Sequence, residues 1–309
     1  MQPNPTHPRI SIVVLTYNRA GELLANLERL LALPENPPVI LADNGSTDGT
    51  VALVSARFPS IRVVECHSNL GAAGRNLALA CVDTEYVAFC DDDTWWAPGS
   101  LELAVQLLDA WPRVGVLNAR VVVGPDDTTD PTCVLMRASP LGSVGLPGPS
   151  LIGYMAGACV FRTALFREIG GYEPRLFIGG EEALVSLDVL ASGYAIVYCD
   201  QMTLHHHPSP ARDSALRRRM LARNAAWVAW LRLPWSEALA TTLRALGVFT
   251  REGTLARDGI ELLAGLAWAA PRRQVVPQPI LAMRARVRAA ERNPGAHAAT
   301  TVGKFDAPG

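Results

Sequence analysis

Several common sequence features are missing from this chain. Its six cysteines, at positions 66, 81, 90, 133, 159 and 199, include no CxxC pair, and several lie inside apolar runs. This pattern favours buried, reduced thiols over a disulfide framework or a zinc site, and it predicts a cytoplasmic protein. The first residues contain no charged segment followed by an apolar stretch, so they do not resemble a signal peptide.

Long apolar runs are also missing. No uninterrupted run reaches the ~18–20 residues that a membrane helix needs. The best candidate, 224–248, is broken by Arg232, Pro234, Glu237 and Arg244. We therefore expect a soluble protein that could still touch a membrane surface, at the inner face of the membrane.

Charge is unevenly distributed along the 309 residues. Residues 1–210 carry 12 Arg against 22 Asp and Glu, a balance of −10, whereas residues 211–309 have a balance of +9. With 49% hydrophobic and 18% charged residues, the composition excludes a disordered chain and permits a large core. An acidic N-terminal part and a basic C-terminal part indicate two regions with different functions.

Apolar runs alternate with segments of helical spacing through the first two hundred residues, which predicts a parallel sheet built from βαβ units. The expected strands are 10–15, 39–42, 61–65, 86–90, 114–118, 157–162 and 195–199, and the expected helices are 20–33, 49–57, 98–110, 163–169 and 181–192, with another opening within 69–76. Residues 124–150 are rich in turn formers and predict a long loop around a short strand at 132–137. Helices are expected at 212–232, 235–248 and 254–269, which suggests a division into 1–210, a helical region 211–285 and a flexible tail 286–309.

Three consecutive carboxylates, Asp91, Asp92 and Asp93, follow the apolar segment 86–90. Close carboxylates repel one another by roughly a kcal/mol or more per pair unless a positive charge lies among them. A divalent cation, which prefers oxygen ligands, would relieve this repulsion, and so would a solvated loop tip. Because open α/β sheets bind ligands beyond the carboxyl ends of their strands, we interpret the run as a metal site for a phosphate-bearing ligand.

Other polar clusters are open to two interpretations. Glu181 and Glu182 follow two glycines at a helix start, where the helix dipole stabilises acidic side chains. One of the two glutamates could instead serve as a general base. Of the consecutive histidines 205–207, either His206 or its two neighbours would face a site, because side chains alternate along an extended chain. An imidazole there could complete a metal site, and a solvated cluster is the alternative.

The segment 69–76 contains glycines but neither GxGxxG nor the lysine of a P-loop, so it is a poor match to a dinucleotide-binding loop. Arg75 lies near a helix start, where it could bind a phosphate group or simply face solvent.

Taken in order, these segments resemble the family 2 glycosyltransferases, which are inverting enzymes with the GT-A fold. The resemblance runs from Ile10 to about His207 and rests on 12–19, 43–48, 69–76, 91–93, 170–172 and the Gly-Glu-Glu helix start. It implies an α/β fold with a mostly parallel central sheet flanked by helices, followed here by a C-terminal helical extension.

The resemblance also implies roles for individual residues. The donor-binding residues would be Thr16, Tyr17, Asn18, Asp43, Arg75, Asp91 and Asp92, with Thr16, Tyr17 and Asp43 around the nucleotide base and Arg75 close to it. Asp91 and Asp93 would form the DxD element that holds Mg²⁺ or Mn²⁺, with His206 as a further candidate ligand.

Glu182 would be the catalytic base, at a position where the family more often has Asp. Leu184 and Asp188 stand where many members have Asp and Arg, so the acceptor is left open.

The implied donor is a UDP-, dTDP- or GDP-linked sugar, the acceptor is a glycan, a lipid-linked sugar or a small molecule, and no nucleic-acid partner is expected. Arginines and tryptophans of the C-terminal helices could contact an anionic membrane, or the tryptophans could pack internally; they are Arg217, Arg218, Arg219, Arg223, Trp227, Trp230 and Trp235. A nucleotidyltransferase would be expected to have a Gly-rich basic loop where Thr16–Arg19 stands. An inactive binding module would not need Asp91, Asp93 and Glu182.

Overall fold

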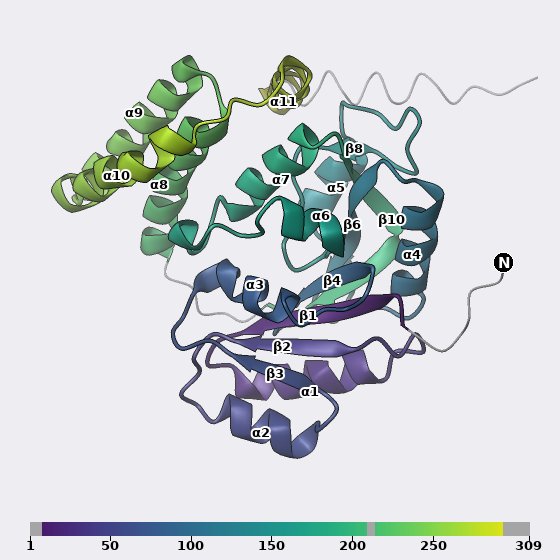
Figure 1. Ribbon diagram of the computed structural model, residues 1–309. Coiled ribbons are helices and arrows are strands. Elements are labelled where there is room, and N and C mark those ends of the chain that lie inside the picture. Colours follow the sequence, from purple (N-terminus) through teal and green to yellow (C-terminus); the bar gives the residue numbers. More distant parts are fainter. Residues whose placement is uncertain (1–7, 209–213, 293–309) are drawn as a thin grey trace, which may run out of the picture.

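The computed structural model describes residues 8–208 and 214–292, and within them ten strands form one mixed sheet (Figure 1). The main path is β3-β2-β1-β4-β9-β6-β10-β5, with β7 paired to β6 and β8 to β10. The strands are β1 Ile10–Thr16, β2 Val39–Asp43, β3 Arg62–Glu65, β4 Tyr86–Asp91, β5 Thr94–Trp96, β6 Val114–Val123, β7 Thr128–Thr129, β8 Ser150–Leu151, β9 Cys159–Arg162 and β10 Ala195–His206.

The central strands are apolar on both faces, as the sequence predicts for parallel strands covered on both sides. In β1, Ile12 and Val13 are fully buried, and in β4 Val87 and Phe89 are fully buried. β1 pairs in parallel with both β2 and β4, so the carboxyl ends of these three strands meet at one edge of the sheet. This edge carries the residues expected to bind the donor.

Eleven α-helices are found in the described residues, and the longer ones bury a stripe at helical spacing, as α1 does with Leu23, Leu27 and Leu30. Their bounds are α1 Ala20–Leu31, α2 Thr50–Arg57, α3 Gly74–Leu79, α4 Ser100–Ala110, α5 Pro131–Arg137, α6 Thr163–Glu168, α7 Glu181–Ala191, α8 Ser214–Arg232, α9 Trp235–Arg251, α10 Leu255–Ala269 and α11 Gln278–Arg292. Figure 1 shows α8, α9 and α10 gathered beside α7, away from β1, β2 and β3.

Three expectations about local structure were wrong. Strand β9 runs antiparallel to both β4 and β6, so the sheet is mixed and not a simple succession of βαβ units. The expected strand at 132–137 is helix α5, because the Asp130 side chain accepts from the Thr132 backbone N–H at 2.7 Å and Pro131 occupies the first helical turn. The tail expected from 286 is helical as far as Arg292, since α11 continues to that residue; residues 293–309 lie outside the described residues.

Candidate functional site

The site forms where the acidic run after β4 meets the residues that end β1 and β2. In the strand register Thr16 lies opposite Asp43, and Leu15 lies opposite Asp91. Thr16 and Asp43 are each only 1% exposed, so both side chains are enclosed at this edge. The sheet register therefore brings three of the donor-binding candidates, Thr16, Asp43 and Asp91, to the same edge of the sheet.

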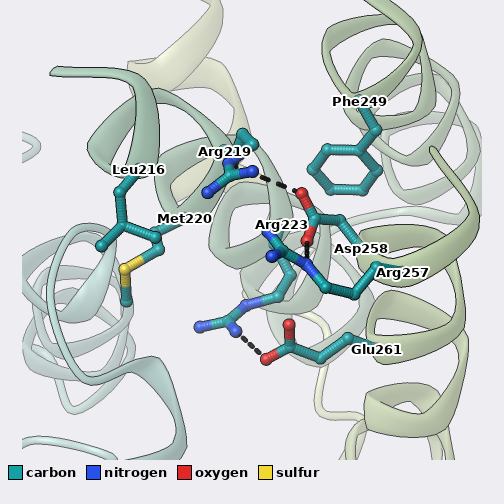
Figure 2. Close-up of a pocket in the computed structure, with 8 residues that line it drawn as sticks. All are labelled: Leu216, Arg219, Met220, Arg223, Phe249, Arg257, Asp258 and Glu261. Atoms are coloured by element: carbon teal, nitrogen blue, oxygen red, sulfur yellow. Dashed lines mark hydrogen bonds and ion pairs between the residues drawn. The ribbon is translucent and has the colours of Figure 1, made fainter. Parts of the chain in front are cut away.

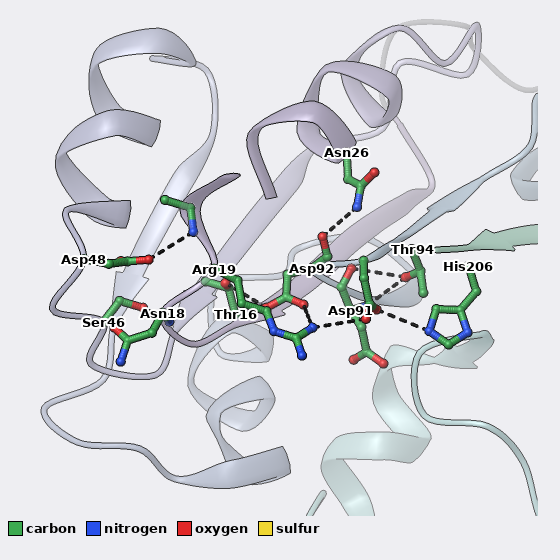
Figure 3. A network of polar contacts seen from close by, with 12 residues as sticks. Thr16, Asn18, Arg19, Asn26, Ser46, Asp48, Asp91, Asp92, Thr94 and His206 are labelled. Carbon is green, nitrogen blue, oxygen red and sulfur yellow. Dashed lines mark hydrogen bonds and ion pairs between the residues drawn. The ribbon is translucent and has the colours of Figure 1, made fainter. Parts of the chain in front are cut away.

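Asp92 ties the ends of β1 and β4 together (Figure 3). Its carboxylate accepts from the Thr16 hydroxyl and from the Arg19 guanidinium, both at 3.0 Å, and the same guanidinium reaches Asp93 at 3.1 Å. The Asn26 amide donates to the Asp92 backbone oxygen at 2.6 Å. Burial raises the pKa of Asp92 to about 6, although Arg19 opposes that rise. The Asp92 side chain is thus buried and bound by Thr16 and Arg19.

Asp93 pairs with a histidine from the far end of the sheet. Its Oδ1 lies 3.6 Å from Nε2 of His206, and its side chain is 2% exposed. Burial opposes ionisation, but the contacts with His206 and the neighbouring guanidinium lower the pKa of Asp93. His205 and His207 instead pack against the ring of Trp95, with centroids 5.0 and 4.8 Å away. The alternation along β10 therefore selects His206 as the histidine that faces the acidic run.

Asp91 faces a buried arginine. Its carboxylate forms an ion pair with Arg75, whose side chain is 3% exposed while that of Asp91 is 45% exposed. The guanidinium also lies about 6 Å from the rings of Phe89 and Tyr172. Burial alone would lower the pKa of Arg75, but the negative charge of Asp91, with smaller contributions from neighbouring groups that include Tyr172 and Glu182, raises that pKa overall. Gly157 passes so close that a Cβ there would lie 2.5 Å from Asp91 Oδ2.

Asp43 has one carboxylate oxygen engaged and one without a partner. Oδ2 accepts from the backbone N–H groups of Gly45 and Ser46, at 3.1 and 2.9 Å. Oδ1 is buried and has no hydrogen bond among the described residues. A buried acceptor without a partner is costly, and an N–H group of a bound ligand would satisfy it.

Asn18 joins the turns that follow β1 and β2 (Figure 3). Its backbone N–H donates to the Ser46 hydroxyl at 2.9 Å, and its side-chain oxygen accepts from the Thr47 backbone N–H at 2.7 Å. Asn18 has a φ of 52°, a conformation that asparagine tolerates better than most residues. The neighbouring Tyr17 is 44% exposed and remains accessible to a ligand.

The two glutamates begin helix α7 beside the acidic run. Glu181 is buried, and its Oε2 has no hydrogen-bond partner among the described residues. Burial raises the pKa of Glu182, and the negative charge of Asp91 adds to the rise, while the positive charges of Arg75 and Arg217 oppose it. Burial likewise raises the pKa of Glu181, and the charge of Glu182 adds to that effect. Glu182 therefore lies within electrostatic range of both members of the Arg75–Asp91 pair.

Asp188, which departs from the family pattern, has a structural role. Its carboxylate is held by the guanidinium of Arg232 on α8, with one of the two contacts at 3.1 Å. Asp188 therefore fastens α7 to α8. Leu184 is 6% exposed and packs in the core.

The candidate metal ligands are only partly assembled. Asp93 and His206 lie together, but the Asp91 carboxylate is directed to Arg75. In the part of the chain that the structure describes, no group of three or more His, Cys, Asp or Glu side chains is placed to hold a metal ion. The donor types nevertheless fit Mg²⁺ or Mn²⁺, which accept carboxylate oxygens and, for Mn²⁺, imidazole.

Sequence reasoning missed Arg19, Asn26 and Gly157. Arg19 lies three residues after the end of β1, and a cation close to a strand end was the available signal. Asn26 occupies a core-facing position of α1 and is 5% exposed, and a polar residue in an apolar stripe was its signal. No local pattern marks Gly157, because its close approach to Asp91 exists only in the folded chain.

The C-terminal helices enclose a recess of about 290 Å³ between α8, α9 and α10 (Figure 2). Its arginines are matched by acids: Arg219 lies 3.6 Å from Asp258, and Arg223 pairs with Glu261. The recess contains none of the candidate donor-binding residues. Within the described residues, no helix is both long and apolar enough to cross a membrane.

Comparison with known proteins agrees with this geometry. The model of the family described as glycosyl transferase family 2 matches residues 11–170, just over half of the chain. An N-acetylglucosaminyl-diphospho-decaprenol L-rhamnosyltransferase of Mycobacterium tuberculosis is 27% identical in an alignment of 244 residues, which covers 67% of this chain and 79% of that protein. A UDP-Glc:alpha-D-GlcNAc-diphosphoundecaprenol beta-1,3-glucosyltransferase of Escherichia coli is 29% identical in an alignment of 104 residues, which covers 32% of this chain and 41% of that protein.

Among solved structures, a mannosyltransferase from Pyrobaculum calidifontis in complex with GDP-Man and Mn²⁺ superimposes with a TM-score of 0.56 at 23% identity. The match covers 94% of this chain and 88% of that one. The shared architecture is the GT-A type.

Proposed function

Because the chain belongs to glycosyl transferase family 2, we propose that it moves a sugar from a nucleoside diphosphate to a hydroxyl of a lipid-linked sugar, with inversion at the anomeric carbon. The observation that carries this proposal is that Glu182 lies within electrostatic range of Asp91 and Arg75, although 91 and 107 residues separate it from them in the chain. A base, a buried cation and an acidic strand end in one place suit transfer from a diphosphate leaving group.

The donor would lie across the carboxyl ends of β1, β2 and β4. The unpartnered Oδ1 of Asp43 would accept from an N–H of the nucleotide base, with Tyr17 exposed beside it. Asn18 would shape this end of the donor site through its hydrogen bonds to the turn after β2, and Thr16 through its hydrogen bond to Asp92. The bases of UDP, dTDP and GDP all carry an N–H group, so this contact does not distinguish among the three nucleotides.

Asp91, Asp93 and His206 would hold a divalent cation when the donor is bound. Such a cation would neutralise the charge that develops on the diphosphate as it leaves. Arg19 and Arg75 place positive charge beside these carboxylates.

Glu182 would accept the proton of the acceptor hydroxyl. The hydroxyl oxygen then forms the new bond to the anomeric carbon, on the face opposite the diphosphate. The bond from that carbon to the diphosphate oxygen breaks, and the nucleoside diphosphate leaves with the electron pair. The raised pKa of Glu182 suits this task, since a base is most effective when its pKa approaches the working pH.

A lipid-linked acceptor is supported by the two relatives, whose names both describe sugars on a polyprenyl diphosphate. Such an acceptor lies at a membrane surface, so we also propose peripheral membrane contact. The residues predicted for this contact do not form one surface. Trp227 is buried, and Arg218, Arg219 and Arg223 pair with acids, namely Glu252 directly after α9 and Asp258 and Glu261 of α10.

A different face fits a membrane better. Four apolar side chains of α9 and α10 are between 53% and 69% exposed, and they are Leu239, Leu243, Ile260 and Leu263. The two helices lie against each other, since a Cβ on Gly259 would be 3.8 Å from Leu246. Arg244 and Arg251 of α9 form no ion pair among the described residues and would meet anionic lipid headgroups.

The Glu182→Gln substitution tests the proposed reaction. It preserves size and removes the base, so kcat should fall by about 10²–10⁴-fold while donor affinity stays nearly unchanged. Transfer from nucleotide sugars to a polyprenyl diphosphate sugar would be followed by chromatography, and donor binding by calorimetry with and without Mn²⁺.

The matched control is Glu168→Gln, at an exposed glutamate of α6. Near-normal turnover of the Glu182 variant would exclude this residue as the base. A wild-type protein that binds nucleotide sugars and transfers none of them would identify an inactive binding module.

A further inference from the structure

The loop that leads into the two glutamates has an unusual backbone. Residues 176–180 join a short 3₁₀ turn to α7, and Phe177, Gly179 and Gly180 have φ values of 58°, 85° and 98°. Left-handed backbone is unfavourable for phenylalanine and persists only where the surroundings enforce it. The position of Glu182 therefore depends on whatever holds this loop.

Asn224, in the middle of α8, holds the loop from one side. Its side chain is fully buried, and its amide nitrogen lies 2.7, 3.2 and 2.5 Å from the carbonyl oxygens of Leu176, Ile178 and Gly179. The amide oxygen accepts from Arg223 Nε at 3.0 Å, which fixes the direction in which the NH₂ group points. One side chain thus contacts three carbonyl groups of the segment 176–179, of which that of Leu176 also accepts from the Ile178 backbone N–H at 2.7 Å.

The contact between α8 and the loop leaves little space. A Cβ on Gly179 would lie 2.7 Å from the Leu221 side chain, and one on Gly180 would lie 3.1 Å from the Asn224 side chain. On the opposite side, the backbone N–H of Ala72 donates to the Phe177 carbonyl at 2.8 Å. Ala72 lies three residues before Arg75, so the loop is held between α8 and the segment that carries the buried arginine.

We propose that Asn224 is a positioning residue that sets Glu182 relative to Arg75 and Asp91, which makes α8 part of the catalytic apparatus. This inference rests on the proposed role of Glu182 as the base. Misplacing a reacting group by about 1 Å can cost a factor of 10² in rate, so loss of this contact should act on turnover more than on donor binding.

The test compares Asn224→Asp with Trp227→Phe in the full-length protein. Asn224→Asp keeps the shape and removes the NH₂ donors. Trp227→Phe also deletes a buried hydrogen bond from α8, the one from the indole N–H to the Leu262 carbonyl at 2.9 Å, but that bond joins α8 to α10. Asn224→Ala, which introduces no charge, serves if the aspartate variant does not fold.

We expect kcat of the Asn224 variant to fall by about 10–100-fold with an unchanged donor dissociation constant, and amide hydrogen exchange of residues 177–182 to accelerate. Trp227→Phe should leave both nearly at the wild-type level. A folded Asn224 variant with wild-type kcat, or with unchanged exchange in 177–182, overturns the proposal. If the wild type transfers no sugar, the proposed function fails, and the exchange experiment still decides whether Asn224 holds the loop.

Discussion

The ion pair between Arg75 and Asp91 permits a quantitative prediction for Asp91→Asn. Arg75 is almost completely buried, and Asp91 is its ion-pair partner among the described residues. Removing one partner of a fully buried pair typically costs about 3–5 kcal/mol, because it leaves a charge without compensation. The Asp91 side chain is 45% exposed, so solvent screens the pair, and we expect a loss of about 2 kcal/mol.

The loss can be measured by calorimetry and urea unfolding. With an unfolding entropy of about 2.1 cal/mol/K per residue, a chain of 309 residues has ~0.65 kcal/mol/K, so 2 kcal/mol lowers Tm by about 3 °C. Glu28→Gln is the control, since Glu28 pairs with Arg57 where both side chains are more than half exposed. Its cost should stay below about 1 kcal/mol.

A double-mutant cycle gives the decisive comparison. In an Arg75→Met background the buried guanidinium is absent and needs no compensation, so Asp91→Asn should cost less than about 0.5 kcal/mol there. An equal cost in both backgrounds would refute the argument that Asp91 compensates the buried guanidinium. Asp91 would then have to be assigned to donor or metal binding alone.

Two further predictions concern the helix start of α7 and the outer face of α9 and α10. The pKa of Glu181 is raised in the folded protein, first by burial and then by the charge of Glu182. At pH values between the ordinary pKa of 4.5 and the raised pKa, the folded state therefore binds more protons than the unfolded state. The free energy of unfolding consequently falls as pH rises through this range. Glu181→Gln should therefore raise Tm over wild type increasingly from about pH 5 to pH 8, whereas Glu168→Gln should not; a constant difference in Tm across this range would contradict the assigned cause. Wild-type protein should co-sediment with anionic liposomes at low salt and lose this binding with Leu243→Glu or Leu263→Glu, but keep it with Leu135→Glu on α5, whose side chain is 71% exposed. Wild-type protein that stays in the supernatant with anionic vesicles at low salt would rule out the membrane face.

The elements that position the site could be predicted because their signals are local. Continuous apolar runs mark β1 and β4, and the leucines of α1 recur at helical spacing, so residues within a few positions of one another determine these elements. The acidic run falls at the end of β4 for the same reason, and the alternation along β10 limits the choice among the three histidines. The error at α5 came from its apolar residues, which outweighed the Asp130–Pro131 start signal.

Only the tertiary structure decided how the three aspartates are used. They are consecutive in sequence, yet Asp91 faces Arg75, Asp92 faces Thr16, and Asp93 faces His206, because their partners come from different elements. Local periodicity carries no information about contacts between residues so far apart in the chain. The same holds for Asn224, whose three carbonyl partners lie more than forty residues earlier in the chain. Sequence alone therefore located the chemical groups, and long-range packing determined which of them face one another.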